Sequence, residues 1–92
     1  MTARLRAVRR QIDQLDEQLL RLVNQRARLA LEIGRIKQRR KWPVFDAARE
    51  AAVLRHLAYV NQGPLSAAAV RHIFQAILCE SRRRERTPRL KR

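Results

Sequence analysis

The sequence predicts an all-α fold with three helices, one long and two shorter, and three observations lead to this prediction. Apolar residues in the first forty positions recur at alternating steps of three and four, which is the seam of a long amphipathic helix. Two shorter segments repeat this periodicity, and stretches that contain proline separate the three segments. No segment alternates apolar and polar residues as a half-buried strand would.

The first helix is expected to run from about Ala3 to about Arg40, with Gly34 as its only weak point. At ~1.5 Å per residue it would be roughly 55 Å long, whereas a compact chain of 92 residues has a radius of gyration of about 12 Å. Such a rod would leave part of its apolar seam uncovered, so we expect the chain to pair with a second copy. The seam consists of Leu5, Val8, Ile12, Leu15, Leu19, Leu22, Leu29, Ile33 and Ile36.

The second and third helices are bounded by residues that favour helix ends. Pro43 cannot lie inside a helix and Asp46 is a good capping residue, so a second helix is expected from Asp46 to Val60. The turn-forming residues 61–64 end it. Ser66 is expected to cap a third helix that runs to about Arg84.

The chain is strongly basic, with a formal net charge of +14. Such a field attracts anions, which could be RNA, DNA, an anionic membrane surface or a small polyanionic metabolite. The charge is densest over residues 82–92, so residues 1–86 are expected to form one helical domain and residues 87–92 a basic, disordered tail. No apolar run is long enough to span a membrane and no signal peptide is recognisable, so a cytoplasmic location is expected.

The composition excludes several kinds of chemistry. Two glycines are too few for a phosphate-binding loop or a dinucleotide-binding fingerprint. The single cysteine excludes an internal disulfide and a multi-cysteine zinc site, and the spacing of the two histidines matches no zinc motif. We therefore expect neither a metal nor a cofactor.

Charged residues interrupt the apolar seam of the first helix. Arg26 occupies a heptad position between Leu22 and Leu29, where an unpaired charge is costly and needs an anionic partner. Lys37 follows three turns later on the same side of the helix. Arg9 lies roughly 25 Å from Arg26 along the helix, so it could reach this face only on the partner in an antiparallel dimer. From the pattern alone, ordinary ion pairs or exposed surface positions would also explain these residues.

Polar residues also gather on one face of each shorter helix. Asp46, Arg49 and Glu50 are one turn apart on the second helix, where a surface ion-pair ladder would also explain them. Ser81 and Glu85 prolong the apolar stripe of the third helix. Such a continuation suggests a lined cavity, unless the packing of the helix simply ends there.

These positions together resemble the all-helical class of chorismate mutases, over about residues 5–85. Residues 8–16, 24–30 and 33–37 resemble the first helix of that family. Pro43-Val44, Asp46 and Arg49-Glu50 fit the family pattern that follows, and residues 73–77 with Glu80-Ser81 resemble its third helix. The joint spacing is specific, whereas any one element alone would be a weak signal.

The resemblance implies an intertwined homodimer of three-helix chains, with two equivalent sites that each contain residues of both chains. It also implies an isomerase that converts chorismate to prephenate by a Claisen rearrangement, on the route to phenylalanine and tyrosine. Such a reaction needs no nucleophile, metal or general base. It needs a substrate held in a compact chair-like conformer, and hydrogen-bond donors aimed at the ether oxygen, where negative charge grows.

The same resemblance gives the polar residues roles toward the substrate. Arg9 of one chain and Arg26 of the other would bind the two carboxylates, which guanidinium groups suit well, and Ser81 would touch one of them. Arg49 and Glu50 would hold the hydroxyl side of the substrate. The substrate-binding residues would be Arg9, Arg26, Lys37, Asp46 through its backbone, Arg49, Glu50, Ser81 and Glu85.

Lys37 and Glu85 would lie at the ether oxygen of the substrate. Together with Arg26, which binds a carboxylate, they would be the catalytic residues. Many bacterial members of the family have glutamine at the position of Glu85, and some relatives have glutamate. An ionised carboxylate cannot donate a hydrogen bond to the ether oxygen. We therefore expect Glu85 to act in its protonated form and activity to fall as the pH rises.

Two other functions remain open from the sequence. An isochorismate-pyruvate lyase has a similar architecture and uses a related pericyclic elimination, although the Arg49-Glu50 pair fits a mutase better. A non-enzymatic helical dimer that binds nucleic acid would explain the charge. The sequence has neither the interleaved aromatic residues nor any motif typical of such proteins, so nucleic acid is the less expected partner.

Overall fold

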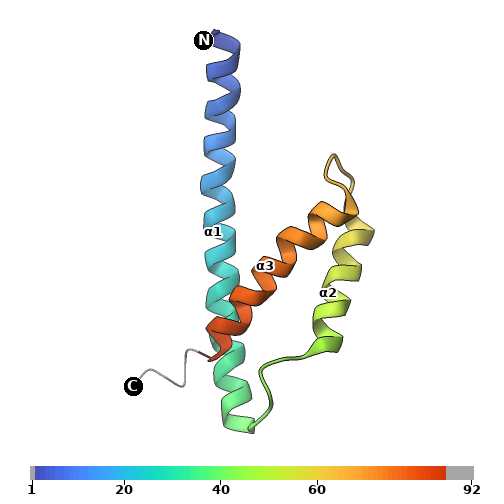
Figure 1. Ribbon diagram of the computed structural model, residues 1–92. Helices are drawn as coiled ribbons and strands as arrows, with labels where there is room; N and C mark the ends of the chain where they lie inside the picture. The colour runs from blue at the N-terminus through green and yellow to red at the C-terminus, as the bar shows by residue number, and fades with distance from the viewer. Residues whose placement is uncertain (1, 87–92) are drawn as a thin grey trace.

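The computed structural model describes residues 2–86, which form three helices (Figure 1). They are α1 (Ala3–Arg40), α2 (Ala47–Val60) and α3 (Ala67–Arg86). The helix α3 crosses α1 and packs against α2, whereas α1 and α2 do not pack against each other in the described part of the chain. Residues 2–86 contain no strand, which confirms the predicted all-α class. The tail predicted at residues 87–92 lies outside the described residues.

The helix ends follow the capping chemistry expected from the sequence. The Asp46 side chain accepts a hydrogen bond from the Arg49 backbone N–H at 3.0 Å, so Asp46 is the cap of α2. Ser66 caps α3 in the same way, with its hydroxyl oxygen 3.1 Å from the Ala69 nitrogen. Between these helices, Gly63 adopts a φ of +78°, which glycine tolerates without a steric penalty. The helix α3 ends at Arg86, two residues beyond the predicted end.

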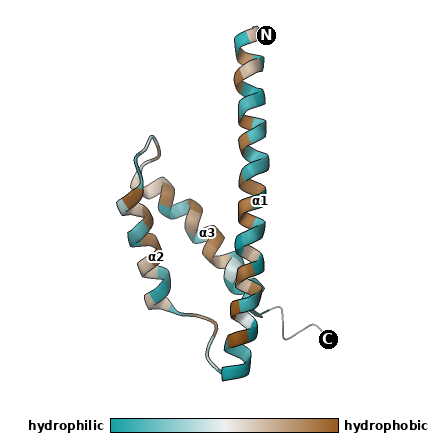
Figure 2. Cartoon of the chain, turned by 180° about the vertical axis from the view of Figure 1, so that it is seen from behind, coloured by the Kyte–Doolittle hydropathy of each residue, from teal (hydrophilic) through white to brown (hydrophobic). Residues whose placement is uncertain are grey.

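The apolar seam of α1 is largely uncovered in the single chain. The side chains of Leu15, Leu19 and Leu22 are 57%, 58% and 59% exposed. Figure 2 shows apolar positions repeating along the part of α1 that extends beyond α3. The radius of gyration is 16.8 Å, well above the ~12 Å of a compact chain of this length. The buried apolar residues in the described part of the chain are Ala30, Val70 and Leu78.

Within residues 2–86, no helix combines the length and the apolar character needed to cross a membrane. Apolar and polar residues are interspersed along α1 (Figure 2), as in an amphipathic helix. The small buried core and the long exposed seam together mean that much of the apolar surface faces outward in one chain.

The crossing of α1 and α3 depends on Gly34, which is buried. A Cβ atom at this position would lie 2.7 Å from the Glu85 Cα and would also collide with the Glu85 carbonyl oxygen. The backbones of the two helices therefore approach too closely for any side chain at position 34. The residue that weakens the helix by propensity is thus the one that lets α3 lie close enough to bring Glu85 to the site.

Replacing Gly34 by alanine should lower the free energy of unfolding by about 1–3 kcal/mol, because the added methyl group forces two backbones apart. At an open helical position the same change would raise stability by roughly 1 kcal/mol. Urea denaturation at a fixed chain concentration measures the difference. Arg35→Ala, at the exposed neighbouring position, serves as the control and should stay within about 0.5 kcal/mol of the wild type. An unchanged or increased stability of Gly34→Ala would contradict the close crossing.

Candidate active site

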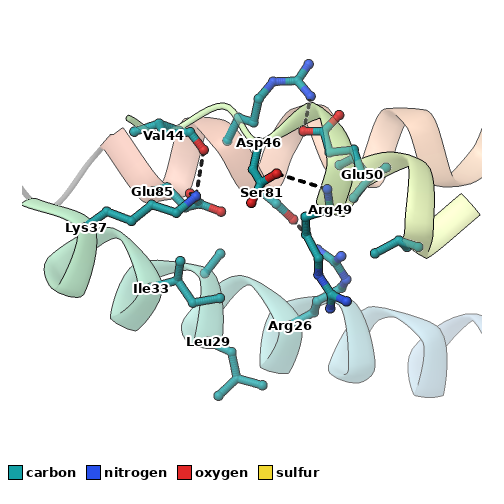
Figure 3. Close-up of a pocket in the computed structure, with 14 residues that line it drawn as sticks. Arg26, Leu29, Ile33, Lys37, Val44, Asp46, Arg49, Glu50, Ser81 and Glu85 are labelled. Atoms are coloured by element: carbon teal, nitrogen blue, oxygen red, sulfur yellow. Dashed lines mark hydrogen bonds and ion pairs between the residues drawn. The ribbon is translucent and has the colours of Figure 1, made fainter. Parts of the chain in front are cut away.

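A cavity of about 370 Å³ lies between the second half of α1, the beginning of α2 and the end of α3 (Figure 3). This volume is at the lower end of the range, about 300–1,000 Å³, that is typical of small-molecule sites. Apolar side chains from all three helices form part of its wall, including Ile33, Val53 and Leu78. Its polar and charged lining consists of Arg26, Lys37, Asp46, Arg49, Glu50, Ser81, Arg82 and Glu85.

One end of the cavity is formed by Lys37 and Glu85. The Lys37 Nζ atom lies 2.8 Å from Glu85 Oε1, and the two side chains are only 17% and 12% exposed. The same ammonium group donates a hydrogen bond of 2.6 Å to the Val44 carbonyl oxygen. Pro43 keeps this connecting segment out of a helix, so the Val44 carbonyl is available as an acceptor. Because an ammonium group has three donors, Lys37 keeps one N–H for a ligand in the cavity.

Arg26 is held at the cavity by the end of α3. Its Nη1 atom donates a hydrogen bond to the Ser81 hydroxyl, which in turn donates to the Ile77 carbonyl oxygen at 3.0 Å. Within residues 2–86, Arg26 forms no ion pair with a carboxylate. The seam position predicted to need an anionic partner therefore faces the cavity, with its charge not compensated by an acid of the described chain.

Arg49 extends from the first turn of α2 into the same part of the cavity as Arg26 (Figure 3). It too forms no ion pair with a carboxylate of the described chain. The Asp46 carboxylate is used by the cap of α2, while Glu50 and Glu85 are paired with cations. Two guanidinium groups thus face one cavity without acidic partners, an arrangement that favours a ligand with negative charges.

The structure brings seven of the eight predicted site residues together in this cavity, and their roles toward a substrate stay predictions. Arg9 is the exception, because it does not line this cavity and lies near the start of α1, seventeen residues before Arg26. This position agrees with the geometry expected from the sequence, in which Arg9 could serve only the site of another copy. The seven residues in the cavity are Arg26, Lys37, Asp46, Arg49, Glu50, Ser81 and Glu85.

Sequence reasoning missed Arg82, which it grouped with the basic residues at the chain end. In the structure Arg82 lies within α3, lines the cavity and forms an ion pair with Glu50. The helical spacing contained a usable signal, because Arg82 follows Leu78 by four residues and precedes Glu85 by three. All three residues therefore lie on one stripe of α3.

No group of three or more His, Cys, Asp or Glu side chains in residues 2–86 is arranged to hold a metal ion. What the cavity offers to a ligand is a set of hydrogen-bond donors on Arg26, Arg49 and Lys37. Arg82 is paired with Glu50, and the Ser81 hydroxyl already donates to the Ile77 carbonyl oxygen. The fold and the site together define a helical protein built to hold a small, multiply negative organic molecule in a fixed orientation.

Residues 8–86 match the family model for chorismate mutase type II, and the chain belongs to this family. Two relatives are the bifunctional chorismate mutase/prephenate dehydratases of Stutzerimonas stutzeri and Pseudomonas aeruginosa. They are 40% and 42% identical over 80 and 79 residues, and each match covers 80% of this chain. The chain spans about a fifth of their length, since each match covers 22% of the relative.

Solved structures show the same likeness over nearly complete chains. A chorismate mutase from Thermus thermophilus superposes with a TM-score of 0.87 at 34% identity, covering 90% of this chain and 96% of that one. Chorismate mutase from Helicobacter pylori, solved in complex with prephenate, superposes with a TM-score of 0.91 at 25% identity. That match covers 99% of each chain. The predicted family is therefore confirmed.

Proposed function

We propose that the chain is a chorismate mutase, an isomerase that rearranges chorismate to prephenate without a cofactor. The observation that carries this proposal is the convergence of Arg26, Arg49 and Lys37 on one cavity, in which neither guanidinium has an acidic partner among residues 2–86. Chorismate has two carboxylates, a hydroxyl group and an ether oxygen, polar groups that match the two guanidinium groups and the remaining ammonium N–H. Membership of the chorismate mutase type II family supports the same substrate.

The reaction is intramolecular: the ether C–O bond breaks while a new C–C bond forms, and no proton has to be transferred. Arg26, together with Arg9 of a second chain, would hold the two carboxylates and Arg49 the hydroxyl side, which keeps the reacting carbon atoms close together. As the C–O bond breaks, negative charge grows on the ether oxygen, and the Lys37 ammonium group at the end of the cavity stabilises it. Apolar neighbours such as Ile33 and Val53 reduce the access of water, which strengthens these interactions.

We further propose that two chains associate as an intertwined homodimer with shared sites. The exposed seam of α1 gives each chain an apolar surface that a second copy would cover. Two symmetry-related sites would result, each with the cavity of one chain and Arg9 of the other. Arg9 would then join Arg26 of the other chain in binding the two carboxylates of the substrate.

The experiment that tests the activity follows the absorbance of chorismate with purified protein and identifies the product by acid conversion to phenylpyruvate. Saturable conversion to prephenate is expected, and Arg26→Ala should abolish most of it because one carboxylate loses its partner. No turnover of chorismate at any pH would contradict the proposal. Turnover of isochorismate to salicylate and pyruvate in its place would identify the related lyase.

The pH dependence of the rate tests the protonation state of Glu85. With Lys37 2.8 Å away, an ionised Glu85 is well paired, but it cannot donate to the ether oxygen. Only a protonated carboxyl group can donate, so the role expected for Glu85 from the sequence requires the rate to fall as the pH rises. Glu85→Gln should flatten the profile and give at least about tenfold higher activity than the wild type at alkaline pH, because the amide donates at every pH.

Glu80→Gln is the matched control for this pH profile, since Glu80 lies on the same helix, is 55% exposed and pairs with Arg83 and Arg84 of α3. It should keep the pH dependence of the wild type. A Glu85→Gln variant whose profile keeps the shape of the wild-type profile would show that Glu85 has no donor role.

A further inference from the structure

Arg82 links three segments around the cavity. Its Nη1 atom lies 2.5 Å from Glu50 Oε2, and this ion pair joins the end of α3 to the first turn of α2. The guanidinium carbon lies 5.5 Å from the centre of the Phe45 ring, in the segment between α1 and α2. The dashed line at Glu50 in Figure 3 marks the ion pair. A planar guanidinium group can stack on a ring and hold a carboxylate at the same time, which an ammonium group cannot do as well.

The position of Glu50 depends on this link because α2 does not pack against α1 in the described residues. The beginning of α2 is instead held by contacts that reach it from α3 and from the connecting segment. The Arg82 and Glu50 side chains are 27% and 22% exposed, so both are partly shielded from water. An ion pair of this kind fixes the carboxylate more firmly than a fully exposed pair would.

The ion pair with Arg82 uses one of the two carboxylate oxygens of Glu50. Oε2 accepts from Arg82, and Oε1 keeps its capacity to accept a hydrogen bond from a ligand. The positive charge of Arg82 also offsets the negative charge of Glu50, which would otherwise repel a dianionic ligand. Hydrogen bonding to Glu50 raises the pKa of the Arg82 guanidinium group above its ordinary value.

We propose that Arg82 is a positioning residue that aims the Glu50 carboxylate at the hydroxyl group of the substrate, and so makes the site selective for the hydroxyl-bearing molecule. This inference rests on the proposed function, because it assumes that chorismate is the substrate. Arg82 acts through Glu50 and needs no contact of its own with the reacting atoms. Its expected effect is therefore on selectivity and KM, with a smaller change in kcat.

The test compares chorismate with an analogue in which hydrogen replaces the hydroxyl group, for the wild type, Arg82→Met and Glu50→Gln. The ratio of kcat/KM for the two substrates measures how well the site uses the hydroxyl. Arg82→Met is expected to lower this ratio about tenfold, the effect of losing one charge-assisted hydrogen bond, mainly through KM for chorismate. In a Glu50→Gln background, adding Arg82→Met should change the ratio little further, because both substitutions disrupt the same interaction.

Arg83→Met is the matched control, because Arg83 is on the same helix, is 61% exposed and pairs with Glu80 outside the cavity. It should leave the ratio unchanged. Arg82→Gln, a second neutral replacement, should give the same substrate ratio as Arg82→Met. It replaces Arg82→Met in the test if that variant does not fold. A wild-type ratio in both neutral variants would overturn the role of Arg82, whereas a wild type that converts neither substrate would overturn the proposed function itself.

Discussion

Replacing Lys37 by methionine is expected to lower kcat by about 10²- to 10³-fold, the typical cost of removing one donor aimed at a developing negative charge. In the structure the ammonium group is held by Glu85 at 2.8 Å and by the Val44 carbonyl at 2.6 Å. Both partners fix its position before a substrate enters, so little rearrangement is needed during the reaction. Because the interaction strengthens only as the C–O bond breaks, KM should change much less than kcat.

The loss of Lys37 also leaves the Glu85 carboxylate without its partner, and this second effect has to be separated from the first. The double variant Lys37→Met with Glu85→Gln removes the unpaired charge while still lacking the ammonium group. It should remain far below Glu85→Gln alone in kcat. Arg39→Met, two residues away at an exposed position, is the control and should keep wild-type kinetics. A kcat of Lys37→Met within a few-fold of the wild type would contradict the assignment.

The second large effect is expected from Arg9, although this residue lies outside the cavity of its own chain. Arg9→Ala should lower kcat/KM by about 10²-fold or more, because a substrate carboxylate would lose a guanidinium partner in a partly desolvated site. Arg10→Ala, the neighbouring exposed arginine, is the matched control and should have a small effect. Steady-state kinetics with chorismate measure both variants. Equal activities of the two variants would remove Arg9 from the site.

The fold could be predicted closely from the sequence because its elements are defined by local chemistry. Apolar periodicity determines α1, Pro43 ends its run, and Asp46 and Ser66 accept backbone hydrogen bonds at the starts of α2 and α3. The end of α3 was placed two residues early, since no local signal marks it. The last turn of α3 contains Glu85, which forms an ion pair with Lys37 of α1. This contact joins residues far apart in the sequence, so local sequence patterns do not indicate it.

The site was predictable where residues interrupt a regular pattern, as Arg26 does in the seam of α1. The site was less predictable where a residue has the same chemical character as its neighbours in the sequence. Arg82 lies in a basic run, and a run of charges favours an exposed surface, which hides the spacing that places Arg82 on the stripe of Leu78 and Glu85. Its contact with Glu50 is a property of the tertiary fold. Gly34 was recognised as a weakness of the helix, but the close approach of the α3 backbone that requires a glycine there is a property of the tertiary fold.

The most direct test of a shared site is to mix two inactive variants, Arg9→Ala and Arg26→Ala. After unfolding and refolding together, about half of the dimers should contain one chain of each kind. Each mixed dimer then has one site with both arginines and one site with neither. Recovery of about a quarter of the wild-type activity per chain is expected, many times that of either variant refolded alone. A mixture no more active than its two components would contradict a site built from both chains.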